Sequence, residues 1–177
     1  MIGRHFMVRR PLQLCLTVIA IGLMPATLLA DDAPPAASDW LYVGGDAGGS
    51  RYSALDQINH KNVWRLERAW TWRHGDLERF PEQRKLAGFQ ATPILLPADA
   101  GGALVLCTPF NRLVALDPAS GKERWSFDPT IQISKSPARP GCLGVSYWRN
   151  TKAGPAEACT HRIFAGTSDR RLLAVDA

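Results

Sequence analysis

Histidine and cysteine are scarce in this sequence, and neither occurs in a spacing that suggests a metal or catalytic site. The four histidines are His5, His60, His74 and His161, and the four cysteines are Cys15, Cys107, Cys142 and Cys159. No two of them stand at the short spacing of a zinc site, and their positions support no Ser-His-Asp arrangement. The sequence therefore predicts no catalytic residue and no metal ligand.

A strong excess of either charge is also missing. The formal net charge is +5, but Arg4, Arg9 and Arg10 lie in the first thirty residues, which contain no acidic residue. Without these three, 18 basic residues stand against 16 acidic ones. This balance gives no reason to expect a nucleic-acid partner. The glycine-rich stretch 44–49 lacks the lysine that a phosphate-binding loop needs.

The first thirty residues resemble a targeting segment. Arg9 and Arg10 precede an uncharged, mostly apolar stretch, 12–30, which Pro25 interrupts. This order is typical of a cleaved secretory signal peptide, and the length of the stretch also fits a single membrane anchor. Either kind of segment would direct the chain to the periplasm. A membrane anchor would also attach the chain to the inner membrane. Residues 31–38 are polar and proline-rich, which predicts a disordered linker before a domain at 39–177.

Glycine and proline are plentiful, at 15 and 13 residues, as in turn-rich β proteins. The clearest structural pattern is 111–125, which reads NRLVALDPASGKERW. Its run 112–116 has apolar side chains on both faces of a strand, which predicts that both faces are covered. Asp117 and Pro118 favour a tight turn, and Gly121 supplies the left-handed residue of a bulged hairpin loop. The returning strand carries Trp125, which we expect to be largely buried.

This hairpin belongs to an internal repeat of about 59 residues. Residues 162–177, RIFAGTSDRRLLAVDA, align with 103–118, ALVLCTPFNRLVALDP. The repeat predicts an all-β fold with matched antiparallel strands within 103–116 and 162–175. A propeller blade or another stacked β-array explains such a repeat. Two unrelated hairpins that share a common turn are the alternative interpretation.

The pattern from Ala115 to Trp125, A-x-D-x-x-x-G-K-x-x-W, resembles the tryptophan-docking motif of the pyrroloquinoline quinone (PQQ) dehydrogenases. In that family, each such tryptophan lies between neighbouring blades of an eight-bladed propeller. Propellers without catalytic activity also carry this motif, so a second resemblance is needed.

The second resemblance is at the start of the predicted domain. The segments 40–46, 51–53, 55–59 and 69–76 contain, in order, Trp and Asp, Arg-Tyr-Ser, L-x-Q-I-N, and Ala-Trp followed by Gly-Asp. This order resembles the opening of the PQQ-dependent alcohol, glucose and quinate dehydrogenases. It also predicts a short helical turn at 59–66 and a strand at 69–72.

The resemblance implies a periplasmic quinoprotein dehydrogenase that oxidises an alcohol, polyol or sugar. PQQ would be the electron acceptor, calcium would polarise its quinone, and a membrane quinone or cytochrome would take the electrons onward. The chain corresponds to about the first two of the eight blades. The family's catalytic carboxylate and calcium ligands lie further downstream, so we expect this fragment alone to be inactive and to bind no cofactor. The alternatives are a non-catalytic propeller that binds proteins of the cell envelope and a degraded remnant.

The resemblance also implies three positions at the PQQ pocket. Gln90 stands where the family often has glutamate, and its amide can donate and accept hydrogen bonds. An equal alternative is that Gln90 is simply a polar residue at the end of a strand. Leu143 replaces an arginine that meets the acidic cofactor, and a leucine cannot pair with a carboxylate. Arg139 stands where a polar residue, commonly histidine, is found, and its charge could compensate in part.

Export also predicts a disulfide, because the periplasm is oxidising. Cys142 and Cys159 flank a polar loop between two predicted strands and are the expected pair. Cys107 lies in an apolar strand, where we expect a buried free thiol.

Overall fold

The structure is a computed structural model and describes residues 40–132, 139–154 and 157–177. The predicted targeting segment, 1–30, and linker, 31–38, lie outside these residues. The strands of the described residues are β1 (Ile94–Leu95), β2 (Leu104–Cys107), β3 (Leu113–Leu116), β4 (Glu123–Phe127), β5 (Ser146–Arg149), β6 (His161–Gly166) and β7 (Leu172–Asp176). The helical elements there are short: α1 (Asp76–Arg79) and 3-10 turns at Val63–Arg65, Pro81–Gln83 and Ala98–Ala100.

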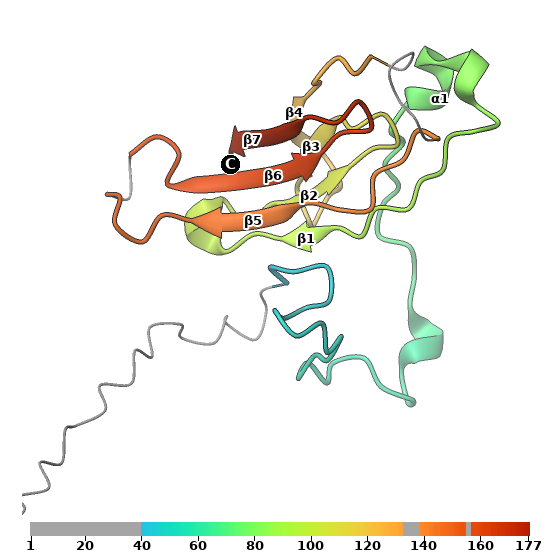
Figure 1. Cartoon of the computed structure of the whole chain (residues 1–177). Coiled ribbons are helices and arrows are strands. Elements are labelled where there is room, and N and C mark those ends of the chain that lie inside the picture. The colour runs from blue at the N-terminus through green and yellow to red at the C-terminus, as the bar shows by residue number, and fades with distance from the viewer. Residues whose placement is uncertain (1–39, 133–138, 155–156) are drawn as a thin grey trace, which may run out of the picture. The chain divides into compact units, whose positions relative to one another are not determined.

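The strands form two antiparallel sheets (Figure 1), one of order β1-β2-β3-β4 and one of order β5-β6-β7. Each strand pairs with its neighbour in the sequence, so both sheets are simple meanders. The prediction of an all-β chain built from antiparallel strands is confirmed.

The second sheet repeats the pairing of the first sheet 59 residues later. In the β2–β3 ladder, Leu104 pairs with Leu116 and Cys107 with Leu113. In the β6–β7 ladder, Ile163 pairs with Val175 and Gly166 with Leu172. The two ladders therefore share one register, which excludes two unrelated hairpins.

The turns between the paired strands repeat as well. Asn111 and Arg170 occupy equivalent positions, and both adopt left-handed backbone angles, with φ of 62° and 72°. In each turn a threonine N–H donates to the carbonyl oxygen of an arginine, Thr108 to Arg112 at 2.9 Å and Thr167 to Arg171 at 2.8 Å. The sequence repeat is thus a structural repeat down to individual hydrogen bonds.

One apolar layer joins the two sheets. Val105, Leu113 and Ala115 of the first sheet belong to the same buried cluster as Ile163 and Ala165 of β6. These residues alternate along their strands, so each sheet presents one face to the layer. Figure 1 shows β5–β7 lying against the first sheet.

The other face of the first sheet is also covered, as the sequence predicts. Val114 and Leu116 form a second buried cluster with Leu106, and Trp70 and Trp72 pack against it. These tryptophans lie in the segment 69–72, which was predicted to be a strand and is not one. It runs without ladder pairing to any described strand and covers the sheet through its side chains.

The turn after β3 has the predicted chemistry. The Asp117 carboxylate accepts hydrogen bonds from the backbone N–H groups of Ala119 and Ser120, at 3.1 and 2.8 Å. Gly121 adopts a left-handed conformation with φ of 69°. Trp70 lies over this turn, and its indole N–H donates to the Pro118 carbonyl oxygen at 3.0 Å.

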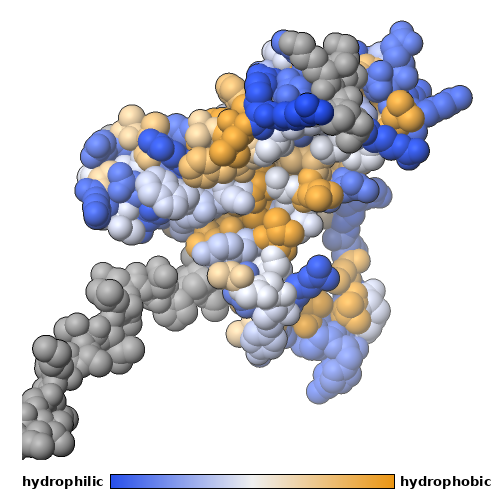
Figure 2. Space-filling view, viewed as in Figure 1, coloured by the Kyte–Doolittle hydropathy of each residue, from blue (hydrophilic) through white to orange (hydrophobic). Residues whose placement is uncertain are grey.

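The stretch 52–66 contains the predicted helical turn, now placed at Val63–Arg65. It leaves many large apolar side chains at the surface (Figure 2), namely Tyr52, Leu55, Ile58, Val63, Trp64 and Leu66. Across the described ranges, no helix has the length and apolar character needed to cross a membrane.

Candidate functional site

Two loop segments meet beside β1 and bring two of the predicted pocket residues together. The Gly88 N–H donates to the Pro140 carbonyl oxygen at 3.4 Å, and the Thr92 N–H donates to the Leu143 carbonyl oxygen at 3.1 Å. Segments 88–92 and 140–143 therefore lie side by side. We call this pair of segments the 90/143 edge, after Gln90 and Leu143, which are both exposed.

The side chains of the 90/143 edge are accessible from solvent. Leu143 is 72% exposed. Gln90 is exposed, and its amide lies over Gly141: a methyl group added there would be 3.9 Å from Gln90 Oε1. Arg139 directly precedes the second segment and is exposed too. The edge thus offers an amide, an apolar side chain and, next to them in the chain, a guanidinium group.

A disulfide holds the 90/143 edge, and it is not the predicted one. Cys107 bonds to Cys142, with a Cα–Cα distance of 6.0 Å, and among the described cysteines Cys159 is free. The prediction was wrong because two cysteines that are close in the sequence need not be close in the folded chain. Cys107 ends β2 on the face that meets the second sheet, and Cys142 belongs to the same buried cluster.

A buried charged group behind the edge was missed by the sequence reasoning. The Asp76 side chain is fully buried, and neither of its carboxylate oxygens has a hydrogen-bond partner among the described residues. Arg112 Nη2 lies 3.6 Å from Asp76 Oδ1, and His74 Nδ1 lies 3.7 Å from Asp76 Oδ2. The His74 ring packs at 5.4 Å from Phe89, the neighbour of Gln90.

The sequence holds a weak signal for this group. Gly75-Asp76 is part of the opening pattern, and Arg112 recurs in the repeat, but no spacing links the two. Arg112 also lies over the Trp72 ring, 5.9 Å from its centroid, and donates to the His74 carbonyl oxygen. One arginine of β3's turn therefore fixes the N-terminal segment onto the first sheet.

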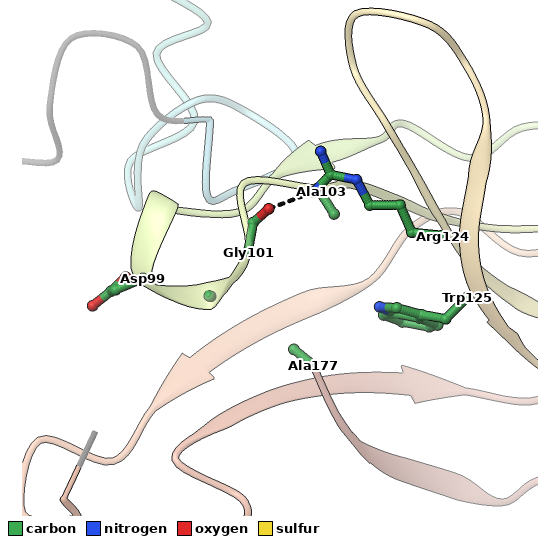
Figure 3. Close-up of a pocket in the computed structure, with 7 residues that line it drawn as sticks. Asp99, Gly101, Ala103, Arg124, Trp125 and Ala177 are labelled. Atoms are coloured by element: carbon green, nitrogen blue, oxygen red, sulfur yellow. Dashed lines mark hydrogen bonds between the residues drawn. The ribbon is translucent and has the colours of Figure 1, made fainter. Parts of the chain in front are cut away.

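The described residues also contain a cavity of about 300 Å³ at the opposite end of the apolar layer (Figure 3). It is lined by Asp99, Ala100, Gly101, Ala103, Arg124, Trp125 and Ala177. None of the predicted pocket residues is among them. Trp125 is half-buried rather than largely buried, because part of its ring faces this cavity.

The polar groups of the cavity are already paired. Arg124 donates to the Gly101 carbonyl oxygen, as Figure 3 shows, and to Asp117 Oδ2 at 2.6 Å. The hydrogen bond from Arg124, together with those from Ser120, holds the pKa of the Asp117 carboxyl well below its usual range. Asp99 pairs with Arg149 at 3.0 Å. The cavity is therefore a weaker candidate than the 90/143 edge for binding a charged ligand.

The two meanders, their shared register and the apolar layer between them define blades of a β-propeller. The family model "Glucose/ethanol/alcohol dehydrogenase, beta-propeller domain" matches residues 40–177. The chain belongs to this family, the PQQ-dependent quinoprotein dehydrogenases, as the sequence resemblance indicates.

The relatives agree with this assignment. Quinoprotein glucose dehydrogenase A of Acinetobacter calcoaceticus is 39% identical over 153 residues, which are 80% of this chain and 18% of the relative. Quinoprotein glucose dehydrogenase of Escherichia coli is also 39% identical, over 82% of this chain and 18% of the relative. The structure of quinohemoprotein alcohol dehydrogenase from Comamonas testosteroni matches with a TM-score of 0.59 at 28% identity, over 78% of this chain and 18% of that protein. This chain thus spans about a fifth of the length of these relatives.

Proposed function

We propose that this chain forms the N-terminal blades of a periplasmic PQQ-dependent dehydrogenase that oxidises a sugar, polyol or alcohol. The names of its relatives support this substrate class, since they include glucose dehydrogenases, a glycerol dehydrogenase and a quinate/shikimate dehydrogenase. We further propose that the 90/143 edge faces the cofactor. The observation that carries this proposal is the pairing of segments 88–92 and 140–143, which places Gln90 and Leu143 together at the surface.

The groups of the 90/143 edge fit an acidic quinone in part. The Gln90 amide can donate to a quinone or carboxylate oxygen, and the exposed Arg139 guanidinium can pair with a carboxylate. Leu143 offers apolar contact to a flat ring but no charge. When bound, PQQ would accept the electrons that leave the alcohol carbon. The contribution of these residues is to bind and orient the cofactor.

Among the described residues, no group of three histidine, cysteine or acidic side chains could hold a metal ion. The proposal therefore assigns neither calcium binding nor proton transfer to this chain. It follows that the chain alone should not turn over substrate, and that weak PQQ binding is the most it could show.

The DNA that follows the codon for Ala177 provides the first test. A continuing reading frame with further tryptophan-docking repeats supports the proposal, and the longer product should then reduce dye with PQQ, calcium and a sugar or alcohol. An immediate stop codon argues for a remnant. A long product that folds but binds no PQQ argues for a non-catalytic scaffold. Rapid dye reduction by the 177-residue chain itself would contradict the division of roles proposed here.

A further inference from the structure

The stretch 139–145 has neither helix nor strand, yet it is anchored on both sides. The Leu143 carbonyl oxygen accepts from Thr92 on one side. On the other side, Gly144 packs against Val43 so closely that a methyl group added there would lie 2.9 Å from Val43 Cγ2. An irregular stretch with such close contacts requires a strong constraint to keep a single conformation.

The disulfide supplies that constraint. Cys107 is fully buried at the end of β2, and Cys142 is 6% exposed. Cys142 directly precedes Leu143, so the bond ties the backbone next to this exposed residue to the buried end of β2. A covalent link over 35 residues also removes conformational freedom that hydrogen bonds alone would leave.

We propose that the Cys107–Cys142 disulfide is a positioning device for the 90/143 edge. It fixes Leu143 against the first sheet, and the Thr92–Leu143 hydrogen bond then carries this position to the strand that follows Gln90. A positioning role rests on the proposed function, because it requires that the edge meets the cofactor. The local ordering of this edge by the bond, without an effect on the whole fold, rests on the contacts alone.

Amide hydrogen exchange on the full chain tests whether the disulfide orders this edge locally. The variant Cys107→Ala/Cys142→Ala is compared with the wild type and with Cys159→Ala, which removes the free thiol. In the double variant we expect the Gly88 and Thr92 amides, which donate to the Pro140 and Leu143 carbonyl oxygens, to exchange at least about tenfold faster, while amides of the β6–β7 ladder change by less than about twofold. The Cys159→Ala variant should match the wild type. Equal acceleration in both sheets, or no change at the edge, would overturn the proposal.

Reduction of the folded wild type provides a second measurement should the double variant fail to fold. The disulfide is reduced to two thiols by the two electrons of a phosphine, which becomes the phosphine oxide; one water molecule supplies the oxide oxygen and the two thiol protons. Alkylation then holds the thiols apart, and the same local pattern of exchange is expected. A reduced protein with unchanged exchange at the Gly88 and Thr92 amides would again overturn the proposal.

A PQQ titration of the longer gene product by tryptophan fluorescence, with and without the two cysteine substitutions, separates this inference from the proposed function. If wild type binds PQQ, the double variant should bind at least about tenfold more weakly, because an unanchored edge must be ordered on binding. Equal binding would show that the disulfide does not position a cofactor-facing edge. If neither protein binds, the proposed function loses support while the exchange data still decide whether the bond orders the edge.

Discussion

Asn111 of the first sheet's turn accepts two hydrogen bonds from Ser168 in the second sheet's turn. The Asn111 Oδ1 atom lies 2.9 Å from the Ser168 backbone nitrogen and 2.7 Å from its hydroxyl oxygen. Asn111 is only 1% exposed and has a left-handed backbone. This contact joins the two repeats at their equivalent turns, where the apolar layer ends.

The variant Asn111→Ala should lower the free energy of unfolding by about 2–4 kcal/mol. It leaves two donors without a partner, and it puts alanine at a left-handed position that asparagine tolerates better. Urea denaturation provides the measurement. Arg170→Ala is the matched control, because Arg170 has the equivalent conformation, with φ of 72°, but is exposed. A loss at Arg170 as large as that at Asn111 would contradict the role of the inter-sheet contact.

Gly121→Ala should be more damaging than Gly101→Ala, although both glycines are left-handed. An added methyl group at Gly121 would lie 2.4 Å from the Trp70 ring, whereas the same group at Gly101 would meet nothing within 4 Å. We expect Gly101→Ala to cost about 1–2 kcal/mol from backbone strain, and Gly121→Ala to cost at least about 1 kcal/mol more because Trp70 must move. Thermal unfolding of the two variants measures the difference, and equal losses would argue against the tryptophan contact.

The buried pair of Asp76 and Arg112 should show strong energetic coupling. Arg112→Met leaves a buried carboxylate without its cation, which should cost about 3–5 kcal/mol. In Asp76→Asn/Arg112→Met the charge is gone, so the double variant should be more stable than the sum of the single losses predicts, by about 1–3 kcal/mol. Denaturant unfolding of the four proteins of this cycle gives the coupling energy. Additive losses would mean that the two side chains act independently.

Acid should weaken the turn that Asp117 organises. Its hydrogen bond from Arg124, with those from Ser120, lowers the folded-state pKa below the ordinary value of 3.8. The resulting stabilisation is present above that ordinary pKa and is lost as the pH falls toward the lower folded value. The melting temperature should therefore fall from about pH 5 to about pH 2 in the wild type, and less steeply in Asp117→Asn. Because the pair is exposed, high salt should reduce the difference; identical slopes at low salt would contradict the prediction.

Leu143→Arg should strengthen PQQ binding in the longer protein, if one is encoded. An arginine on the exposed edge could pair with a cofactor carboxylate, and such a charge-assisted hydrogen bond supports a gain of about tenfold in affinity. A titration of wild type, Leu143→Arg and the uncharged control Leu143→Met measures it. Affinities that are the same for all three would show that this side chain does not face the cofactor.

The parts of the fold that depend on short-range pattern were predictable. The continuous apolar run at 113–116 and the turn of Asp117 and Gly121 are properties of neighbouring residues, and the 59-residue spacing can be read by aligning two stretches, so the sequence displays all three directly. The register of β6 and β7 followed from that of β2 and β3 for the same reason. The segment 69–72 has a strand-like composition, but pairing also needs a partner strand, and composition says nothing about a partner.

Contacts across the apolar layer were not predictable in the same way. The choice of Cys107 over Cys159 as the partner of Cys142 depends on how two sheets stack, and no local pattern reports this. The ion pair of Asp76 and Arg112 likewise joins residues that are far apart in the chain. Gln90, Arg139 and Leu143 came from the family resemblance, and their role at the cofactor stays a prediction.

The meander order of both sheets has a consequence for how the chain folds. Every ladder joins consecutive strands, so each sheet can form through short loops whose closure costs little entropy. Docking of the sheets, through Asn111 and Ser168 and through Cys107 and Cys142, brings together parts far apart in the sequence and should come later. We therefore expect refolding of the reduced chain to show a fast phase of sheet formation and a slower phase of docking, with oxidation of the thiols following the second.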